Sequence, residues 1–191
     1  EEEEIDQLRQ FKHTTTFLLG SAEMEGVLSY ERTRIALTLL AEVIVQAAFR
    51  LSQKWLTQRY GKVLNSMDES GQFAIIGLGK LGGRELTYHS DLDLIFIYSG
   101  EGTTSGPRVI GVQEYWVKLI QRLISCLSTI TSSGYAYKLD ARLRPSGKAG
   151  VLVTHLNQYL KYHETSQPWE HQVLIKGRVI GGSGEVEWYQ K

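Results

Sequence analysis

The hydrophobic positions in the first third of the chain follow a helical period. Residues 1 to about 65 are predicted to be helical, and one long helix is expected to end near Gly61. Its apolar stripe, with spacings of four and three residues, is formed by Ala36, Leu40, Val43, Ala47, Leu51 and Trp55. The pattern indicates a supporting helix with no chemistry of its own.

Beyond residue 72 the pattern changes to short strands separated by turns. Strands are predicted over residues 73–76, 91–98 and 135–144. Glycines follow the first strand, a loop rich in Gly, Ser and Thr spans 101–107, and Pro145-Ser146-Gly147 closes the third strand.

Helices are predicted between and after these strands. One amphipathic helix carries an apolar stripe, with Cys126 beside it as a small core residue, formed by Val112, Trp116, Leu119, Leu123 and Leu127. Two more are expected over 155–163 and from Pro168 to about residue 180. The order of elements predicts an α+β fold, a small mixed sheet flanked by helices, with a helical N-terminal region over 1–65 and a second domain over 66–185.

Composition narrows the classes of partner. The 191 residues contain 21 Lys and Arg against 21 Asp and Glu, so the chain lacks the basic excess typical of nucleic-acid binding. No uninterrupted apolar stretch approaches the ~20 residues of a membrane span, and a single cysteine cannot form an internal disulfide. We expect a cytoplasmic protein with neither nucleic acid nor membrane as partner. Without an initiator methionine or a signal peptide, the sequence is expected to be an excised fragment of a longer protein.

The segment Asp91-Leu92-Asp93 carries the first candidate chemistry. Strand alternation puts both carboxylates on one face, with Cα atoms about 6.5 to 7 Å apart, within reach of one metal cluster. Surface strands often alternate acidic and apolar residues, but here Ile95 and Ile97 continue the same face. A charge at the end of a buried strand is costly unless it is paired or bound to metal.

The third strand places another acidic residue between cations. Lys138, Asp140, Arg142 and Arg144 share one face. One interpretation is a solvent-exposed face of salt bridges, as antiparallel sheets often have. The other is a metal carboxylate beside guanidinium groups that bind phosphate oxygens. If this strand neighbours 91–98, three carboxylates converge.

The glycine-rich turn over 77–83 is a candidate phosphate-binding loop. Its backbone N–H groups can surround phosphates, with Lys80 and Arg84 adding positive charge. It also fits the dinucleotide-binding pattern G-x-G-x-x-G, but Asp91 and Asp93 come too early for that fold. It is not a Walker loop, because leucine follows Lys80, and a simple hairpin turn stays open as an alternative.

Lys176 lies on the predicted stripe of the last helix with Trp169, Val173 and Ile180, so it is expected to point inward toward an anion or to extend its amine to solvent. The histidines show no metal-ligand spacing that predicts zinc.

Taken together, the segments GLGKLGGRELTYHSDLDLIF, LDARLRPSGKAG and PWEHQVLIKGRV resemble bacterial glutamine synthetase adenylyltransferase, a family of the polymerase-β-like nucleotidyltransferase superfamily. The resemblance covers roughly residues 72 to 182. It implies a nucleotidyltransferase catalytic domain in which Asp91, Asp93 and Asp140 match the metal triad for two Mg²⁺ ions. Nucleotide-binding positions are then expected at Gly79, Lys80, Gly82, Gly83, Arg84, Ser90, Arg142, Arg144 and Lys176.

The resemblance further implies transfer of AMP from ATP to a tyrosine of glutamine synthetase, regulating nitrogen assimilation, with a PII-type signalling protein as a partner of the longer protein. Members have two such halves, and ARLRPSGKAGVLVT and WEHQVLIKGR resemble the C-terminal, adenylylating half. Ser146, His171 and Gln172 differ from the de-adenylylating half, which acts by phosphorolysis. Rival hypotheses are that second half, a nucleotide-sensing module without turnover, and a dinucleotide-binding oxidoreductase domain.

Overall fold

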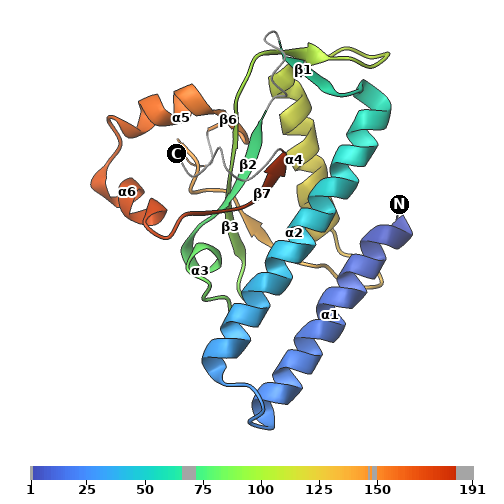
Figure 1. The fold of residues 1–191 in the computed structure, drawn as a ribbon, viewed down its shortest axis with the longest axis vertical. Helices are drawn as coiled ribbons and strands as arrows, with labels where there is room; N and C mark the ends of the chain where they lie inside the picture. The colour runs from blue at the N-terminus through green and yellow to red at the C-terminus, as the bar shows by residue number, and fades with distance from the viewer. Residues whose placement is uncertain (1, 66–71, 146, 148–149, 184–191) are drawn as a thin grey trace.

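The N-terminal region forms a helical hairpin. The structure is a computed structural model that describes residues 2–65, 72–145, 147 and 150–183. Helix α1 spans Glu2–Met24 and α2 spans Tyr30–Tyr60, and the two run antiparallel side by side (Figure 1). Ser29 caps α2 by accepting a hydrogen bond from the Arg32 N–H, and Gly61, at a φ of 79°, ends it as predicted.

The predicted apolar stripe of α2 was wrong in its direction. Val43 is 54% exposed, whereas its neighbours Ile44 and Val45 are fully buried. The buried positions of α2 spread over more than one face because the helix packs against α1, α4 and β7.

Two sheets carry the strands of the described residues. β1 (Val63–Asn65) pairs antiparallel with β4 (Gly102–Thr104). The larger sheet has the order β5-β3-β2-β7, with β6 also paired to β3. Its strands are β2 (Phe73–Gly77), β3 (Leu92–Tyr98), β5 (Leu139–Asp140), β6 (Thr154–His155) and β7 (Arg178–Ser183). β5 and β6 are parallel to β3, whereas β2 is antiparallel to both β3 and β7, so the sheet is mixed.

Four more helices lie between these strands. They are α3 (Gly79–Gly82), α4 (Val112–Ser128), α5 (Leu156–His163) and α6 (Pro168–Leu174). The predicted stripe of α4 is confirmed, because all five of its residues are buried. A capping box between Gln167 and Glu170 starts α6.

Two predicted elements were wrong in extent. The third strand is only Leu139–Asp140, because the chain turns at Arg142 instead of continuing to residue 144. The last helix stops at Leu174, not near residue 180, and Gly177 donates its N–H to the Leu174 carbonyl at 2.7 Å. The strand β7 follows, and it was not predicted because residues up to about 180 fitted a helical pattern.

The large sheet is covered on both faces (Figure 1). On one face Phe73 stacks between Phe49 of α2 and Trp116 of α4, with ring centroids 5.6 and 4.6 Å apart. On the other face Ile95 and Ile97 pack with Leu156, Val173 and other residues of α5 and α6. This confirms the mixed α+β class with a small mixed sheet flanked by helices. The division at residue 65 stays a prediction.

Helix α2 is long and apolar enough, by length and composition, to cross a membrane. Half of its most apolar window is nevertheless buried within the molecule, and core helices of folded domains pass the same test. Packing against α1, α4 and β7 accounts for the buried half, whereas Ile35, Leu39 and Val43 are exposed.

Candidate active site

Asp93 lies at the start of a buried strand, on the face that α5 and α6 cover. It shares that face with Ile95 and Ile97, because side chains of one strand alternate between faces. Asp91 directly precedes the strand and is exposed, whereas Asp93 is half-buried. The predicted position of the pair, at the mouth of a buried strand, is what the structure shows.

Asp140 is the register partner of Asp93. β5 runs parallel to β3 with Leu92 opposite Leu139 and Asp93 opposite Asp140. Partners in register on adjacent strands project from the same face, with strands about 4.8 Å apart. The two carboxylates thus lie side by side, as expected if the third strand neighboured 91–98.

Like charges and burial act together on Asp93. Burial raises the pKa of its carboxyl above the ordinary value, and the nearby Asp140 and Asp91 carboxylates raise it further. Arg142 and Lys80 oppose this shift in pKa. A group in this condition gains from any additional cation placed between the aspartates.

In the structure Arg142 is paired with Asp140. Its backbone N–H donates to Asp140 Oδ1 at 2.8 Å, and its Nε donates to Oδ1 and Oδ2 at 2.9 and 2.8 Å. Nη2 completes an ion pair with Oδ2. The Arg142 side chain is 64% exposed, so most of its surface faces solvent.

The glycine-rich turn approaches Asp93 closely. After β2, the Leu78 N–H donates to the Asp93 carbonyl at 2.9 Å, and the short helix α3 follows. Gly79 has a φ of 51°, and a Cβ atom built on it meets Asp93 Oδ2 at 2.6 Å. Only glycine fits here, so the backbone of the turn approaches the carboxylate closely. Because β2 and β3 are antiparallel neighbours, the parallel unit of a dinucleotide-binding domain is absent here.

The last two loop glycines pack against the C-terminal segment. A Cβ on Gly82 lies 2.0 Å from the Lys176 carbonyl oxygen, and one on Gly83 lies 3.0 Å from Lys176 Cδ. Their role in the structure is close packing. Binding of nucleotide at Gly82 and Gly83 stays a prediction.

The remaining predicted binding residues have varied surroundings. Lys80 and Arg84 are exposed on the glycine turn. Ser90 closes a turn with Thr87, the two hydroxyls lying 2.9 Å apart. Arg144 donates from Nε to the Gly150 carbonyl at 3.2 Å, so it braces the loop after β5.

The expected inward orientation of Lys176 was wrong. Lys176 follows the end of α6 and is 52% exposed, and Trp169 is also exposed because α6 buries only one edge. The expected anionic neighbour does exist. Lys176 Nζ donates to both oxygens of Glu85, at 2.8 and 3.0 Å.

A partly buried cation that the sequence patterns did not indicate is Arg178. It binds carbonyls at the end of α3 and the carboxylate of Glu42 on α2. The last helix was predicted to continue to about residue 180, but Arg178 is the first residue of the strand β7.

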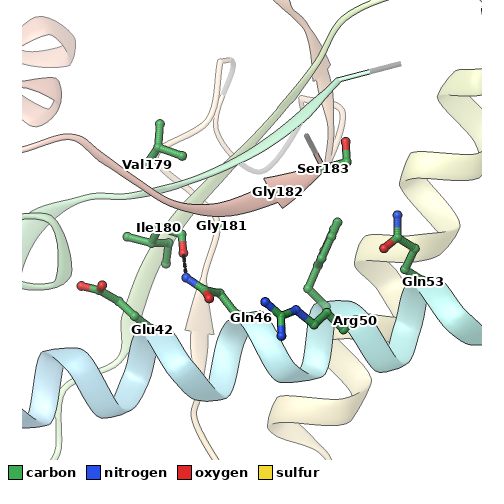
Figure 2. Close-up of a pocket in the computed structure, with 10 residues that line it drawn as sticks. Glu42, Gln46, Arg50, Gln53, Val179, Ile180, Gly181, Gly182 and Ser183 are labelled. Carbon is green, nitrogen blue, oxygen red and sulfur yellow. Dashed lines mark hydrogen bonds between the residues drawn. The ribbon is translucent and has the colours of Figure 1, made fainter. Parts of the chain in front are cut away.

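A separate cavity of about 410 Å³ lies between α2 and the edge strand β7. Figure 2 shows Glu42, Gln46 and Gln53 projecting from α2 toward this strand, with Gln46 bonded to the Ile180 carbonyl at 2.7 Å. The aspartates do not line this cavity, because they lie at the start of β3 and on β5.

The aspartates fit Mg²⁺ in chemical type, because carboxylate oxygens are its usual protein ligands. Among the described residues, no three acidic, His or Cys side chains are gathered closely enough to hold a metal as the structure stands. In the structure Arg142 occupies both oxygens of Asp140. Asp93, its register partner, projects from the same face of the sheet.

A small mixed sheet with a glycine turn against paired aspartates belongs to the nucleotidyltransferase class of folds. The family model for glutamate-ammonia ligase adenylyltransferase matches residues 1–190. The chain therefore belongs to the glutamate-ammonia ligase adenylyltransferase family. At the level of the family, the activity is that of an enzyme that adenylylates glutamine synthetase.

The contact between Arg142 and Asp140 predicts competition between arginine and metal. Arg142→Gln is expected to bind Mn²⁺ more tightly than the parent chain, by about fivefold at most, because an exposed ion pair contributes up to about 1 kcal/mol. Isothermal titration without nucleotide measures this affinity. Arg84→Gln removes the same charge from an exposed position and is the control. An equal gain in both variants contradicts specific competition.

Proposed function

We propose that this chain transfers AMP from ATP to a tyrosine hydroxyl of glutamine synthetase in a Mg²⁺-dependent reaction. The observation that carries the proposal is the pairing of Asp93 with Asp140 in register, with Gly79 against Asp93. Acidic side chains held this close are unfavourable in the absence of a cation. Their placement beside a glycine turn suits a metal-bound triphosphate.

The proposed reaction is an in-line displacement at phosphorus. The tyrosine oxygen forms a bond to the α-phosphorus, the bond from that phosphorus to the bridging α,β-oxygen breaks, and pyrophosphate leaves. The hydroxyl proton must be removed, and Asp140 is the carboxylate assigned to assist. That role requires Arg142 to release Asp140 first.

Asp91, Asp93 and Asp140 are the residues proposed to hold two Mg²⁺ ions. When bound, such a pair stabilises the attacking and leaving oxygens. The chain itself supplies positioning. The backbone of the glycine turn, together with Lys80 and Arg84, would bind phosphate oxygens, and the withdrawn Arg142 becomes a further cation for them.

The rival hypothesis of nucleotide sensing without turnover makes a different prediction. A sensor needs the glycine turn but gains nothing from carboxylates that repel each other. ATP-dependent, Mg²⁺-dependent labelling of glutamine synthetase by the chain, followed with ATP labelled at the α-phosphate, separates the two. Stoichiometric ATP binding without labelled product contradicts the enzymatic proposal.

We also propose that the chain derives from the adenylylating, C-terminal half of the parent enzyme. The sequence WEHQVLIKGR carries this assignment, and its His171 lies on α6 with Nε2 3.0 Å from Ser166 Oγ. Ser146, the other distinguishing position, lies outside the described residues. In-line transfer is reversible, so direction must come from groups around the aspartates and not from the aspartates themselves.

Parallel reactions test the direction. With ATP, Mg²⁺ and unmodified glutamine synthetase, the chain is expected to label the protein. With adenylylated glutamine synthetase and phosphate, release of ADP is expected to be at least about tenfold slower. ADP release in the second reaction without labelling in the first assigns the chain to the other half. A PII-type protein as partner of the parent, and a cytoplasmic location, belong to the same proposal.

A further inference from the structure

A partly buried arginine joins three separate elements behind the glycine turn. Arg178 opens β7 opposite Gly77 of β2. Its Nε donates to the Gly82 carbonyl at 3.3 Å and its Nη2 to the Leu81 carbonyl at 3.1 Å. Nη2 also pairs with the Glu42 carboxylate of α2. One guanidinium thus connects α2, β7 and the end of α3.

Arg178 binds the last carbonyls of α3. Such carbonyls accept no hydrogen bond from within their own helix. A four-residue helix has too few internal bonds to be stable alone, and the last carbonyls accept bonds only from outside it. A cation at these carbonyls also interacts favourably with the helix dipole. Arg178 therefore holds the final turn of α3 in place.

Fixing that end of α3 fixes its other end beside the aspartates. Gly79 is three residues from Gly82, and it approaches Asp93 so closely that a Cβ atom built on it would lie 2.6 Å from Asp93 Oδ2. In the described part of the chain, no hydrogen bond or ion pair links Arg178 to an aspartate of the site. Any influence on chemistry must pass through the position of the glycine turn.

Glu42 extends the connection to the long helix. Its side chain is 14% exposed and that of Arg178 is 26% exposed, so both charges are largely removed from water. Figure 2 shows Glu42 projecting from α2 toward β7. Removing one partner would leave the other charge uncompensated, so the pair keeps the guanidinium directed at α3.

We infer that Arg178, held by Glu42, is a positioning residue for the phosphate-binding turn. This inference rests on the proposed function, in which the turn at 77–83 receives the triphosphate of ATP. Displacing a binding group by about 1 Å can cost on the order of 100-fold in rate, although the displaced group takes no part in the chemistry.

The chain contains a matched control in Arg9. Arg9 also binds two carbonyls and one carboxylate, those of Cys126, Thr129 and Asp6, and its side chain is 4% exposed. It joins α1 to the end of α4, far along the chain from the glycine turn. Arg9→Met and Arg178→Met therefore remove the same kind of contact at two places.

Hydrogen exchange of the full chain tests the inference without relying on activity. The N–H groups of Gly82 and Gly83 bond to the Leu78 and Gly79 carbonyls at 2.9 and 3.0 Å. Arg178→Met is expected to speed their exchange by about tenfold, while Arg9→Met changes it less than twofold. Arg178→Lys, which keeps one charge but not the planar fork, is expected to fall between them. Unchanged exchange in Arg178→Met overturns the inference.

Steady-state kinetics supply the second measurement. Arg178→Met is expected to raise KM for ATP by about tenfold or more, while Arg9→Met lowers stability with KM for ATP unchanged. If the two variants raise KM equally, Arg178 is only structural and the inference fails. If the parent chain transfers no AMP, the proposed function fails, and the exchange rates still decide whether Arg178 positions the turn.

Discussion

Asp93→Asn is expected to abolish AMP transfer, lowering kcat by about 1000-fold or more. The reason is the loss of a carboxylate that faces Asp140 and contacts the glycine turn. Metal-assisted charge stabilisation is worth several kcal/mol, and each 1.36 kcal/mol is a factor of ten in rate. The assay follows labelled AMP on glutamine synthetase at saturating ATP. Full activity in this variant would exclude Asp93 from the site.

The same substitution is expected to stabilise the metal-free chain. Because burial and the neighbouring carboxylates raise the pKa of Asp93 in the folded state, its contribution to stability is fully present only below the unfolded pKa, about 3.9. That contribution is lost as the pH rises through the folded pKa. At pH 7 the ionised Asp93 therefore destabilises the fold, and the neutral asparagine removes this cost.

Thermal unfolding in a chelating buffer measures the effect. The variant is expected to melt up to about 3 °C above the parent at pH 7, and no higher than the parent near pH 4. Saturating Mg²⁺ should reverse the order at pH 7, because only the parent gains full stabilisation from bound metal. A variant that melts lower at pH 7 without metal contradicts the repulsion between Asp93 and its neighbours.

The amphipathic pattern of the sequence predicted the buried residues correctly in helices that bury a single face. Helix α4 is such an element, and Trp116 and Leu119 are buried as its stripe required. Helix α2 is not, because α1 lies on one side and α4 and β7 on others. Apolar residues there recur at several angles, so the predicted stripe contained Leu40, which is buried in the core, together with Val43, which is exposed.

The alternating pattern predicted a third strand that was too long, because the length of this strand is set by its pairing with β3. β3 pairs with β5 only at Leu92 and Asp93, and its later residues Ile97 and Tyr98 pair with β6. Within the alternating run from Tyr135 to Arg144, only Leu139 and Asp140 pair with a neighbouring strand of the described residues. The length of a strand depends on its neighbour, which the run itself does not encode.

The positions of the aspartates could be predicted from the sequence. The contacts of Arg142 with Asp140 and of Arg178 with α3 could not. Strand period and the apolar face of Ile95 located Asp93, and register brought Asp140 to it. That Arg142 folds back on Asp140 depends on a turn two residues long. The hydrogen bond from Arg178 to the Leu81 carbonyl of α3 joins segments that are about 97 residues apart in sequence.

Asp140→Asn is expected to separate turnover from nucleotide binding. The Arg142 N–H bonds to Asp140 Oδ1 at 2.8 Å, and asparagine keeps an oxygen that can accept this bond, so the turn after β5 should persist. The variant loses the charge assigned to metal binding and to deprotonation of the tyrosine. We therefore expect kcat to fall by about 1000-fold, as for Asp93→Asn.

ATP affinity in this variant should change by less than about threefold, because the glycine turn and Lys80 keep their positions relative to Asp93. Equilibrium binding of ATP and single-turnover rates measure the two quantities separately. Asp140→Ala, which also removes the acceptor of the Arg142 N–H, is the comparison and should weaken ATP binding further by releasing that turn. Equal losses of affinity and rate in Asp140→Asn would place Asp140 among the groups that bind ATP, not among those confined to the chemical step.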